Sequence, residues 1–131
     1  MKVIIAGSRK IGRYTDWELV KLVADAVVRS GFEVTCVVSG GARGIDLAGE
    51  TWAESKGIGI VRYPAEWDRF GKAAGMIRNR EMANNADALI AVWDGRSSGT
   101  AGMVREAAER GLKVYVYRAD LLGHDHIDWP T

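Results

Sequence analysis

Short apolar runs alternate along the chain with segments whose apolar residues recur every three or four positions. The apolar runs read KVIIAG, EVTCVVSG, IGIVRYP, DALIAVWDG and KVYVYRA, at residues 2–7, 33–40, 58–64, 87–95 and 113–119. Runs this short, with little alternation of polar residues, are typical of strands that are buried on both faces of a parallel sheet. The pattern therefore predicts five strands.

Helical spacing predicts an element in each interval between these strands. In the first interval, Trp17, Val20, Val23 and Val27 recur at helical positions, with Thr15 or Asp16 as the expected N-cap and Gly31 as the stop. Further helices are expected at about 45–56, 75–85 and 99–111. The polar stretch before the third helix and the tail at 119–131 receive no element.

Strands that alternate with helices predict an α/β fold, a Rossmann-like parallel sheet of about five strands with helices on both faces. No repeat, linker or low-complexity segment interrupts residues 1–131, so we expect a single domain. Right-handed crossovers favour the strand order 3-2-1-4-5, and the flavodoxin-like order 2-1-3-4-5 is the alternative. Either order predicts a ligand beyond the carboxyl ends of the strands.

Glycine, serine, arginine and tryptophan gather where strands end rather than where they begin. Four strands end in GSRK, SGGARGID, YPAEW and DGRSSGT, at residues 7–10, 39–46, 63–67 and 94–100, whereas the turns that enter strands are plain. A glycine-rich turn that opens a helix points free backbone N–H groups at a ligand, at the positive end of the helix dipole. This arrangement predicts a site for an anion, phosphate above all, at one rim of the sheet.

Each residue type in these turns has an expected role in such a site. Hydroxyl groups and arginines, including Arg96, would bind phosphate, and Asp94 would accept hydrogen bonds from ribose. Trp67 would stack on a base or, alternatively, cover the edge of the sheet. Arg78 lies on the third helix, with an ordinary ion pair to Glu81 as its alternative role. The candidate ligand-binding residues are Gly7, Ser8, Arg9, Ser39, Gly40, Gly41, Arg43, Gly44, Trp67, Arg78, Asp94, Gly95, Ser97, Ser98, Gly99 and Thr100.

Motifs and composition exclude several other classes. The chain has neither a Walker A loop nor a G-x-G-x-x-G fingerprint after its first strand, which argues against an ATPase or an ordinary dehydrogenase. With 18 basic and 17 acidic residues the net charge is +1, which argues against nucleic-acid binding by bulk charge, although not against a local basic patch.

The expected compartment is the cytoplasm. The apolar runs are too short to span a bilayer, the first residues do not resemble a signal peptide, and the lone Cys36 is expected in a buried strand. Met76 and Met82 are expected in the core. No metal site is expected, since His124, His126 and Asp128 in the tail have no further ligand cluster.

The strand-end motifs together resemble the SLOG superfamily, which includes DNA-processing protein A, the LOG phosphoribohydrolases and the YpsA-like proteins. The resemblance covers roughly residues 2–118: VSGGARGID resembles a loop of the DNA-processing protein, ADALIAVWDGRSSGT resembles the LOG strand that runs into P-G-G-x-G-T, and IRNREM is similar to the LOG stretch R-K-x-x-M. The combination GSR, YPAEW and GKAAGMIRNREM looks most like the small YspA-type proteins. The resemblance implies a nucleotide-type ligand.

The chain departs from the LOG pattern where that family performs catalysis. The resemblance places Arg78 on the LOG functional arginine, but Met103 stands where LOG enzymes carry a glutamate, and the nearest acid on that helix is Glu106. Asn79 replaces the LOG lysine, and Asp94 and Gly95 replace the proline–glycine pair. Loss of the carboxylate removes the group that would activate water, unless Asp94, Glu66 or Glu81 substitutes.

Three functions follow in order of preference. The first is binding of a nucleotide or a nucleotide-derived ligand (a nucleoside phosphate, ADP-ribose or an NAD-related molecule), for example in a sensor. The second is hydrolysis of the N-glycosidic bond of a nucleotide, with Arg78 as a catalytic residue. The third is DNA binding like that of the DNA-processing protein. No cofactor beyond the nucleotide-type ligand is expected, and helices that flank the sheet would support a homodimer.

Overall fold

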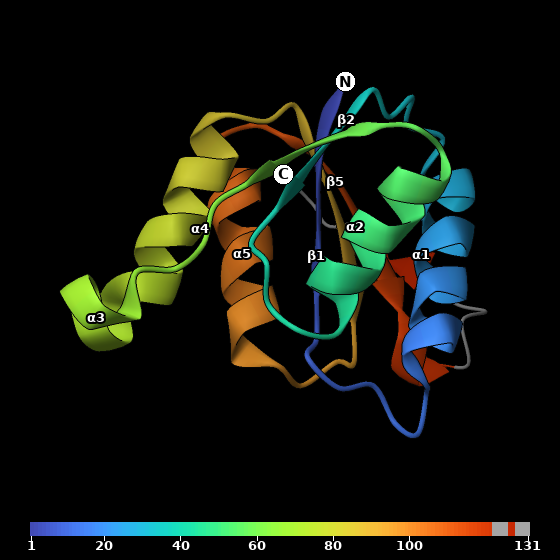
Figure 1. Cartoon of the computed structure of the whole chain (residues 1–131), viewed down its shortest axis with the longest axis horizontal. Coiled ribbons are helices and arrows are strands. Elements are labelled where there is room, and N and C mark those ends of the chain that lie inside the picture. The colour runs from blue at the N-terminus through green and yellow to red at the C-terminus, as the bar shows by residue number, and fades with distance from the viewer. Residues whose placement is uncertain (122–125, 128–131) are drawn as a thin grey trace.

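A computed structural model describes residues 1–121 and 126–127 of the chain, and a six-stranded sheet forms its centre. Helices lie on both faces of the sheet, with α1 and α2 on one side and α4 and α5 on the other (Figure 1). The strands are β1 (Lys2–Gly7), β2 (Cys36–Ser39), β3 (Gly59–Arg62), β4 (Ala88–Trp93), β5 (Lys113–Arg118) and β6 (His126–Ile127). The helices are α1 (Asp16–Ser30), α2 (Ile45–Ser55), α3 (Trp67–Phe70), η1 (Gly71–Ala73), α4 (Ala74–Asn84), α5 (Ser98–Glu109) and η2 (Ala119–Leu121).

The strand order is β3-β2-β1-β4-β5-β6, which confirms the predicted order 3-2-1-4-5 and rules out the flavodoxin-like order. The first five strands pair in parallel, whereas β6 pairs antiparallel with β5, so that Val116 lies opposite Ile127. The sequence left this tail segment unassigned. Because the chain reverses direction of winding between β1 and β4, the carboxyl ends of these two central strands flank the crevice where ligands of such sheets bind.

Alternate side chains of the central strands enter two separate hydrophobic clusters. Val3 and Ile5 of β1 pack in the cluster under α1 and α2, while Ile4 and Ala6 pack in the cluster under α4 and α5. A strand that is covered on both faces needs apolar residues at every position, which explains the nearly uninterrupted run from Val3 to Ala6.

The ends of α1 follow the predicted signals, and its buried face follows the predicted stripe except at Trp17. Thr15 caps the helix in a capping box with Glu18, and Gly31 ends it at φ +71°, a conformation that glycine adopts without strain. The buried residues are Leu19, Val23 and Ala26, whereas Trp17 is 64% exposed and lies near Lys21. Val20 and Val27 of the predicted stripe are partly buried and pack against the same cluster, so only Trp17 departs from the expectation.

Other expectations about single elements need correction. The polar stretch that the sequence left without an element contains the short helix α3 and the turn η1. Met76 is exposed rather than in the core, while Met82 is buried as expected, and Cys36 is only half-buried. Among the described residues, no helix has both the length and the apolar character that crossing a bilayer requires.

Candidate anion-binding cleft at the strand ends

The end of β1 is joined tightly to the end of β4. A side chain at Gly7 would place its Cβ 2.1 Å from the carbonyl oxygen of Val92, so only glycine permits this approach. The next residue, Ser8, donates its N–H to the same carbonyl at 3.1 Å, and its buried hydroxyl accepts the N–H of Asp94 at 3.1 Å. The two central strands thus present their following loops side by side.

Asp94 shapes the loop after β4 through its own carboxylate. One oxygen accepts the N–H groups of Arg96 and Ser97, each at 2.8 Å, and the other accepts the hydroxyl of Ser97 at 3.0 Å. Burial alone would raise the pKa of Asp94, but the hydrogen bonds from Ser97 and Arg96 outweigh it and lower the pKa below its ordinary value. The carboxylate thus accepts three hydrogen bonds from its own loop while Asp94 also lines the larger cavity, and its predicted role as acceptor for a ribose stays a prediction.

The loop held by Asp94 leads into an open helix N-terminus. Among the described residues, the backbone N–H groups of Ser98, Gly99 and Thr100 donate to no protein acceptor. The side chain of Thr100 is almost fully buried, lines the adjoining cavity, and its hydroxyl has no partner within the described part of the chain. Three free N–H groups and a hydroxyl at the positive end of a helix dipole form a site suited to an anion.

The loop after β2 contributes less of its side chains than the sequence predicted. Ser39 is fully buried and donates its hydroxyl to Glu50 of α2 at 2.7 Å. The other oxygen of Glu50 accepts Nε of Arg62 at 2.8 Å. Ser39 therefore fastens α2 to the sheet instead of facing a ligand.

Arg78 of α4 reaches across to this loop. Its guanidinium donates to the carbonyl oxygen of Gly40 at 2.7 Å and to Oδ1 of Asn79 at 3.0 Å, and the predicted alternative, an ion pair with Glu81, does not form. A Cβ on Gly40 would lie 2.5 Å from this guanidinium, so the glycine admits the arginine. Burial and the nearby charge of Arg9 lower the pKa of Arg78, while Asp46 raises it.

Asp46, in the first turn of α2, is a buried carboxyl group at the edge of the cleft. The side chain is 5% exposed, and Oδ2 accepts the N–H of Ala42 at 3.3 Å. Burial raises the pKa of Asp46 to about 6, opposed by the N–H groups of Ala42 and Gly7 and by the charge of Arg78.

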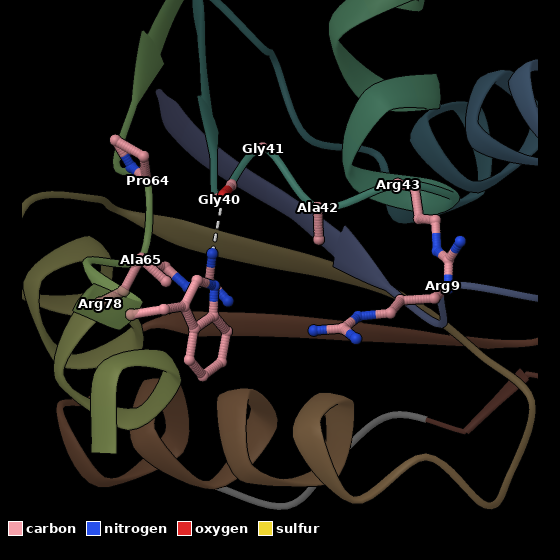
Figure 2. A pocket seen from close by; sticks show the side chains of 9 residues that line it. Arg9, Gly40, Gly41, Ala42, Arg43, Pro64, Ala65 and Arg78 are labelled. Carbon is pink, nitrogen blue, oxygen red and sulfur yellow. Dashed lines mark hydrogen bonds between the residues drawn. The ribbon is translucent and has the colours of Figure 1, made fainter. Parts of the chain in front are cut away.

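Two adjoining cavities form one cleft over these loops. The smaller, of about 410 Å³, lies between the loop after β2 and the segment after β3, and Figure 2 shows Arg9 reaching toward it from the side opposite Arg78. Its lining residues are Arg9, Gly40, Gly41, Ala42, Arg43, Pro64, Ala65, Trp67 and Arg78. The larger, of about 850 Å³, extends over the N-terminus of α5. Its lining residues are Ala6, Gly7, Ser8, Arg9, Lys10, Ala42, Asp46, Trp67, Lys72, Gly75, Met76, Arg78, Asn79, Met82, Asp94, Ser97, Ser98, Gly99, Thr100, Gly102, Met103, Arg105 and Glu106.

Charge is distributed unevenly around this cleft. Five cationic residues that line it make no side-chain hydrogen bond or ion pair within the described residues, and we call them the cleft cations: Arg9, Lys10, Arg43, Lys72 and Arg105. The carboxylates that line the cleft all interact with other groups of the protein. Asp46 and Asp94 accept backbone N–H groups, and Glu106 forms ion pairs with Arg80, at 3.6 Å, and with Arg110. The cleft therefore presents a positive surface.

The cleft brings together thirteen of the sixteen predicted ligand-binding residues, and three lie elsewhere. These three are Ser39, Gly44 and Gly95, which line neither cavity. Gly44, with φ +84°, packs against the backbone of Arg9, and Gly95, with φ +80°, packs against the side chain of Arg118. Arg96 lines neither cavity. Trp67 is 50% exposed and lines both cavities, which leaves its ring accessible for the predicted stacking.

Several lining residues escaped the sequence analysis. Lys10 lies in the loop after β1, while Met76 on α4 and Arg105 on α5 lie on helix faces that the helical pattern did not identify as lining a site. Lys10 could have been found from its place directly after Arg9, whereas no sequence signal distinguishes Arg105 from an ordinary surface arginine.

No group of three or more potential metal ligands forms among the described residues. Of the tail residues considered for a metal, His124 and Asp128 lie outside the described residues, and for His126 only its place in β6 is described.

Comparison with known proteins supports the resemblance seen in the motifs. The model of the YspA, cpYpsA-related SLOG family matches residues 1–70. The Gene 61 protein of Mycobacterium phage D29 is 38% identical over 120 residues, which cover 86% of this chain and 93% of the relative.

The solved structure of DNA processing protein A (DprA) from Streptococcus pneumoniae is similar in fold, with a TM-score of 0.68 at 23% identity over 88% of this chain. The matched part is 49% of the DprA chain, so this chain spans about half of that protein. At this identity the similarity concerns the fold alone. Because the family model matches more than half of the chain, the chain belongs to the YspA, cpYpsA-related SLOG family.

Proposed function

We propose that the protein binds a nucleotide or a nucleotide-derived ligand in the cleft at the carboxyl ends of its strands. The observation that carries this proposal is the N-terminus of α5. Among the described residues, three free N–H groups and Thr100, whose buried hydroxyl has no partner, line a cavity that also has unpaired cations in its wall. Phosphate satisfies all of these donors at once.

The rest of the cleft suits the non-phosphate parts of such a ligand. Trp67 and Met76 are exposed apolar side chains on the wall of the larger cavity, and an aromatic face beside a phosphate site is suited to a base. The ligand class therefore includes nucleoside phosphates, ADP-ribose and NAD-related molecules, and a protein that only binds them would act as a sensor.

Calorimetric titration with AMP, ADP-ribose and NAD tests the proposal, with Arg9→Gln as the diagnostic variant. Arg9 lines both cavities and makes no side-chain bond within the described residues, so its loss should weaken binding without unfolding the protein. A charge-assisted hydrogen bond contributes about 1.5–3 kcal/mol, which corresponds to a loss of about tenfold or more in affinity. Arg13→Gln is the matched control, since Arg13 is exposed and lines neither cavity. Absence of binding by the wild type, or equal binding by Arg9→Gln, contradicts the proposal.

A second candidate function, hydrolysis of the N-glycosidic bond, is favoured by Asp46 alone. Met103 is buried in the core, Glu106 is paired with two arginines, and neither Glu66 nor Glu81 lines a cavity. Asp46 lines the larger cavity close to Arg78, and its raised pKa suits a group that exchanges protons near neutral pH. Water would add to C1′ of the ribose as the bond to the base breaks, with the proton of the water passing through Asp46 to the departing base.

Chromatography distinguishes the two functions. Under the second, incubation of AMP with the wild type releases free adenine, and Asp46→Asn abolishes the release while AMP still binds. AMP that stays intact at high protein concentration excludes hydrolysis and leaves the binding function standing.

A further inference from the structure

The smaller cavity offers a place for a negatively charged group that is separate from the N-terminus of α5. Three arginines surround it (Arg9, Arg43 and Arg78), over a floor made by the backbone at Gly40 and Gly41. No residue of α5 belongs to its lining. Arg9 and Arg78 also line the larger cavity and can contact a phosphate bound at Thr100, but such a phosphate would leave Arg43, which lines only the smaller cavity, without an anion.

The charges of this cavity are not balanced by the protein itself. Arg9 and Arg43 make no side-chain ion pair or hydrogen bond within the described residues, and Arg9 lies close enough to Arg78 to lower its pKa. Asp46 partly compensates Arg78, but its own oxygen is engaged with the N–H of Ala42. Cations that repel one another at the wall of a cavity are stabilised by an anion placed between them.

The two cavities share Arg9, Ala42, Trp67 and Arg78 in their walls, so one molecule can extend from one into the other. Volumes of about 410 Å³ and about 850 Å³ each fall within the usual range of small-molecule sites, roughly 300–1,000 Å³. The ligand that fills both is thus larger than one that fills either.

We propose that the ligand carries two phosphate groups separated by at least one sugar, one at the N-terminus of α5 and one among Arg9, Arg43 and Arg78. This inference rests on the proposed nucleotide-binding function and names its ligand class: a nucleoside bisphosphate or a 5′-phosphorylated dinucleotide, rather than a nucleoside monophosphate.

Two variants with the same change in charge separate the two places. Arg43 lines only the smaller cavity and Arg105 only the larger, and neither side chain makes a hydrogen bond or ion pair within the described residues. The wild type, Arg43→Gln and Arg105→Gln are titrated calorimetrically with AMP, with adenosine 3′,5′-bisphosphate and with 5′-phosphorylated diadenylate.

We expect the wild type to bind at least one of the two-phosphate ligands about tenfold or more tightly than AMP. Arg43→Gln should remove most of this advantage and leave the affinity for AMP within about twofold, whereas Arg105→Gln should weaken all three ligands. The inference is overturned if AMP binds as tightly as both larger ligands, or if Arg43→Gln weakens AMP as much as it weakens them. Binding of AMP, ADP-ribose or NAD by the wild type without any preference for the two-phosphate ligands overturns this inference alone. Failure of the wild type to bind any of these nucleotides refutes the proposed function as well.

Discussion

Asp46 should make the stability of the fold depend on pH in the direction opposite to that of most native carboxylates. Its pKa rises from the ordinary 3.8 to about 6 because the side chain is buried, and the groups that face it are the N–H groups of Ala42 and Gly7, Arg78 and Glu50. The folded state therefore holds this proton more tightly than the unfolded state. The stabilisation from the protonated form is complete below about pH 4 and is lost as the pH rises through about 6.

The size of the effect follows from the shift. A difference of about two pKa units at about 1.4 kcal/mol each gives about 3 kcal/mol that folding loses between about pH 4 and pH 7. Asp94, Asp120 and Glu18 have lowered pKa values and change stability in the opposite direction over the acid range, so the total curve hides the contribution of Asp46. A comparison with a variant that lacks only this titration isolates it.

Asp46→Asn is that variant, because asparagine keeps the shape and one oxygen that can accept the N–H of Ala42. Urea denaturation of both proteins at several values of pH gives the difference in the free energy of unfolding, wild type minus variant. We expect this difference to fall by about 3 kcal/mol from about pH 4 to about pH 7. A difference that stays constant over this range, or a carboxyl carbon resonance of Asp46 that titrates near pH 4, refutes the reasoning.

Two further pairs of measurements test other parts of the site. Gly7→Ala should destabilise the protein by about 1–3 kcal/mol, because the new Cβ would lie 2.1 Å from the carbonyl oxygen of Val92. Gly102→Ala, in open space on α5, should stabilise the protein by about 0.5–1 kcal/mol. Urea denaturation that gives both changes in stability the same sign contradicts this pair of predictions. Thr100→Val should leave the melting temperature unchanged or higher, since the hydroxyl is buried without a partner among the described residues, yet weaken AMP binding several-fold by calorimetry. A variant that loses stability and keeps its affinity would assign the hydroxyl to the fold instead of the ligand.

The strand order and the location of the cleft could be predicted from sequence because both follow from chain direction. Parallel strands place all their carboxyl ends on one edge, so residues that follow strands meet there whatever their side chains do. Which face of a helix turns inward is decided by packing. On α1 the pattern favoured Trp17, but Leu19 and the small Ala26 allow the helix to approach its neighbours, and Trp17 stays at the surface.

The roles of polar side chains were predicted less well, because a hydrogen bond needs two partners that the sequence does not place together. Ser39 and Glu50 are 11 residues apart and bond in the interior, which no spacing rule reveals. Asp94 lines the larger cavity, yet its carboxylate also accepts hydrogen bonds from its own loop, which the sequence did not predict. Residues in strand-end loops thus divide into those that build the site and those that face the ligand, and only the three-dimensional structure separates them.

The near balance of charge over the whole chain does not hold locally at the cleft, which is positive. The chain carries 18 basic and 17 acidic residues, which argues against binding by bulk charge. Yet the carboxylates that reach the cleft are engaged with the protein's own donors, while the cleft cations face the open cavities. Arg9 and Arg78 repel each other, and although Asp46 lies beside Arg78, the side chain of Arg9 has no acidic partner among the described residues. An electrostatic cost that persists at a concave surface is the property expected of a binding site, because the ligand supplies the missing charge. Specific recognition of a small anion requires only this local excess, and it is compatible with a net charge of +1 in the whole chain.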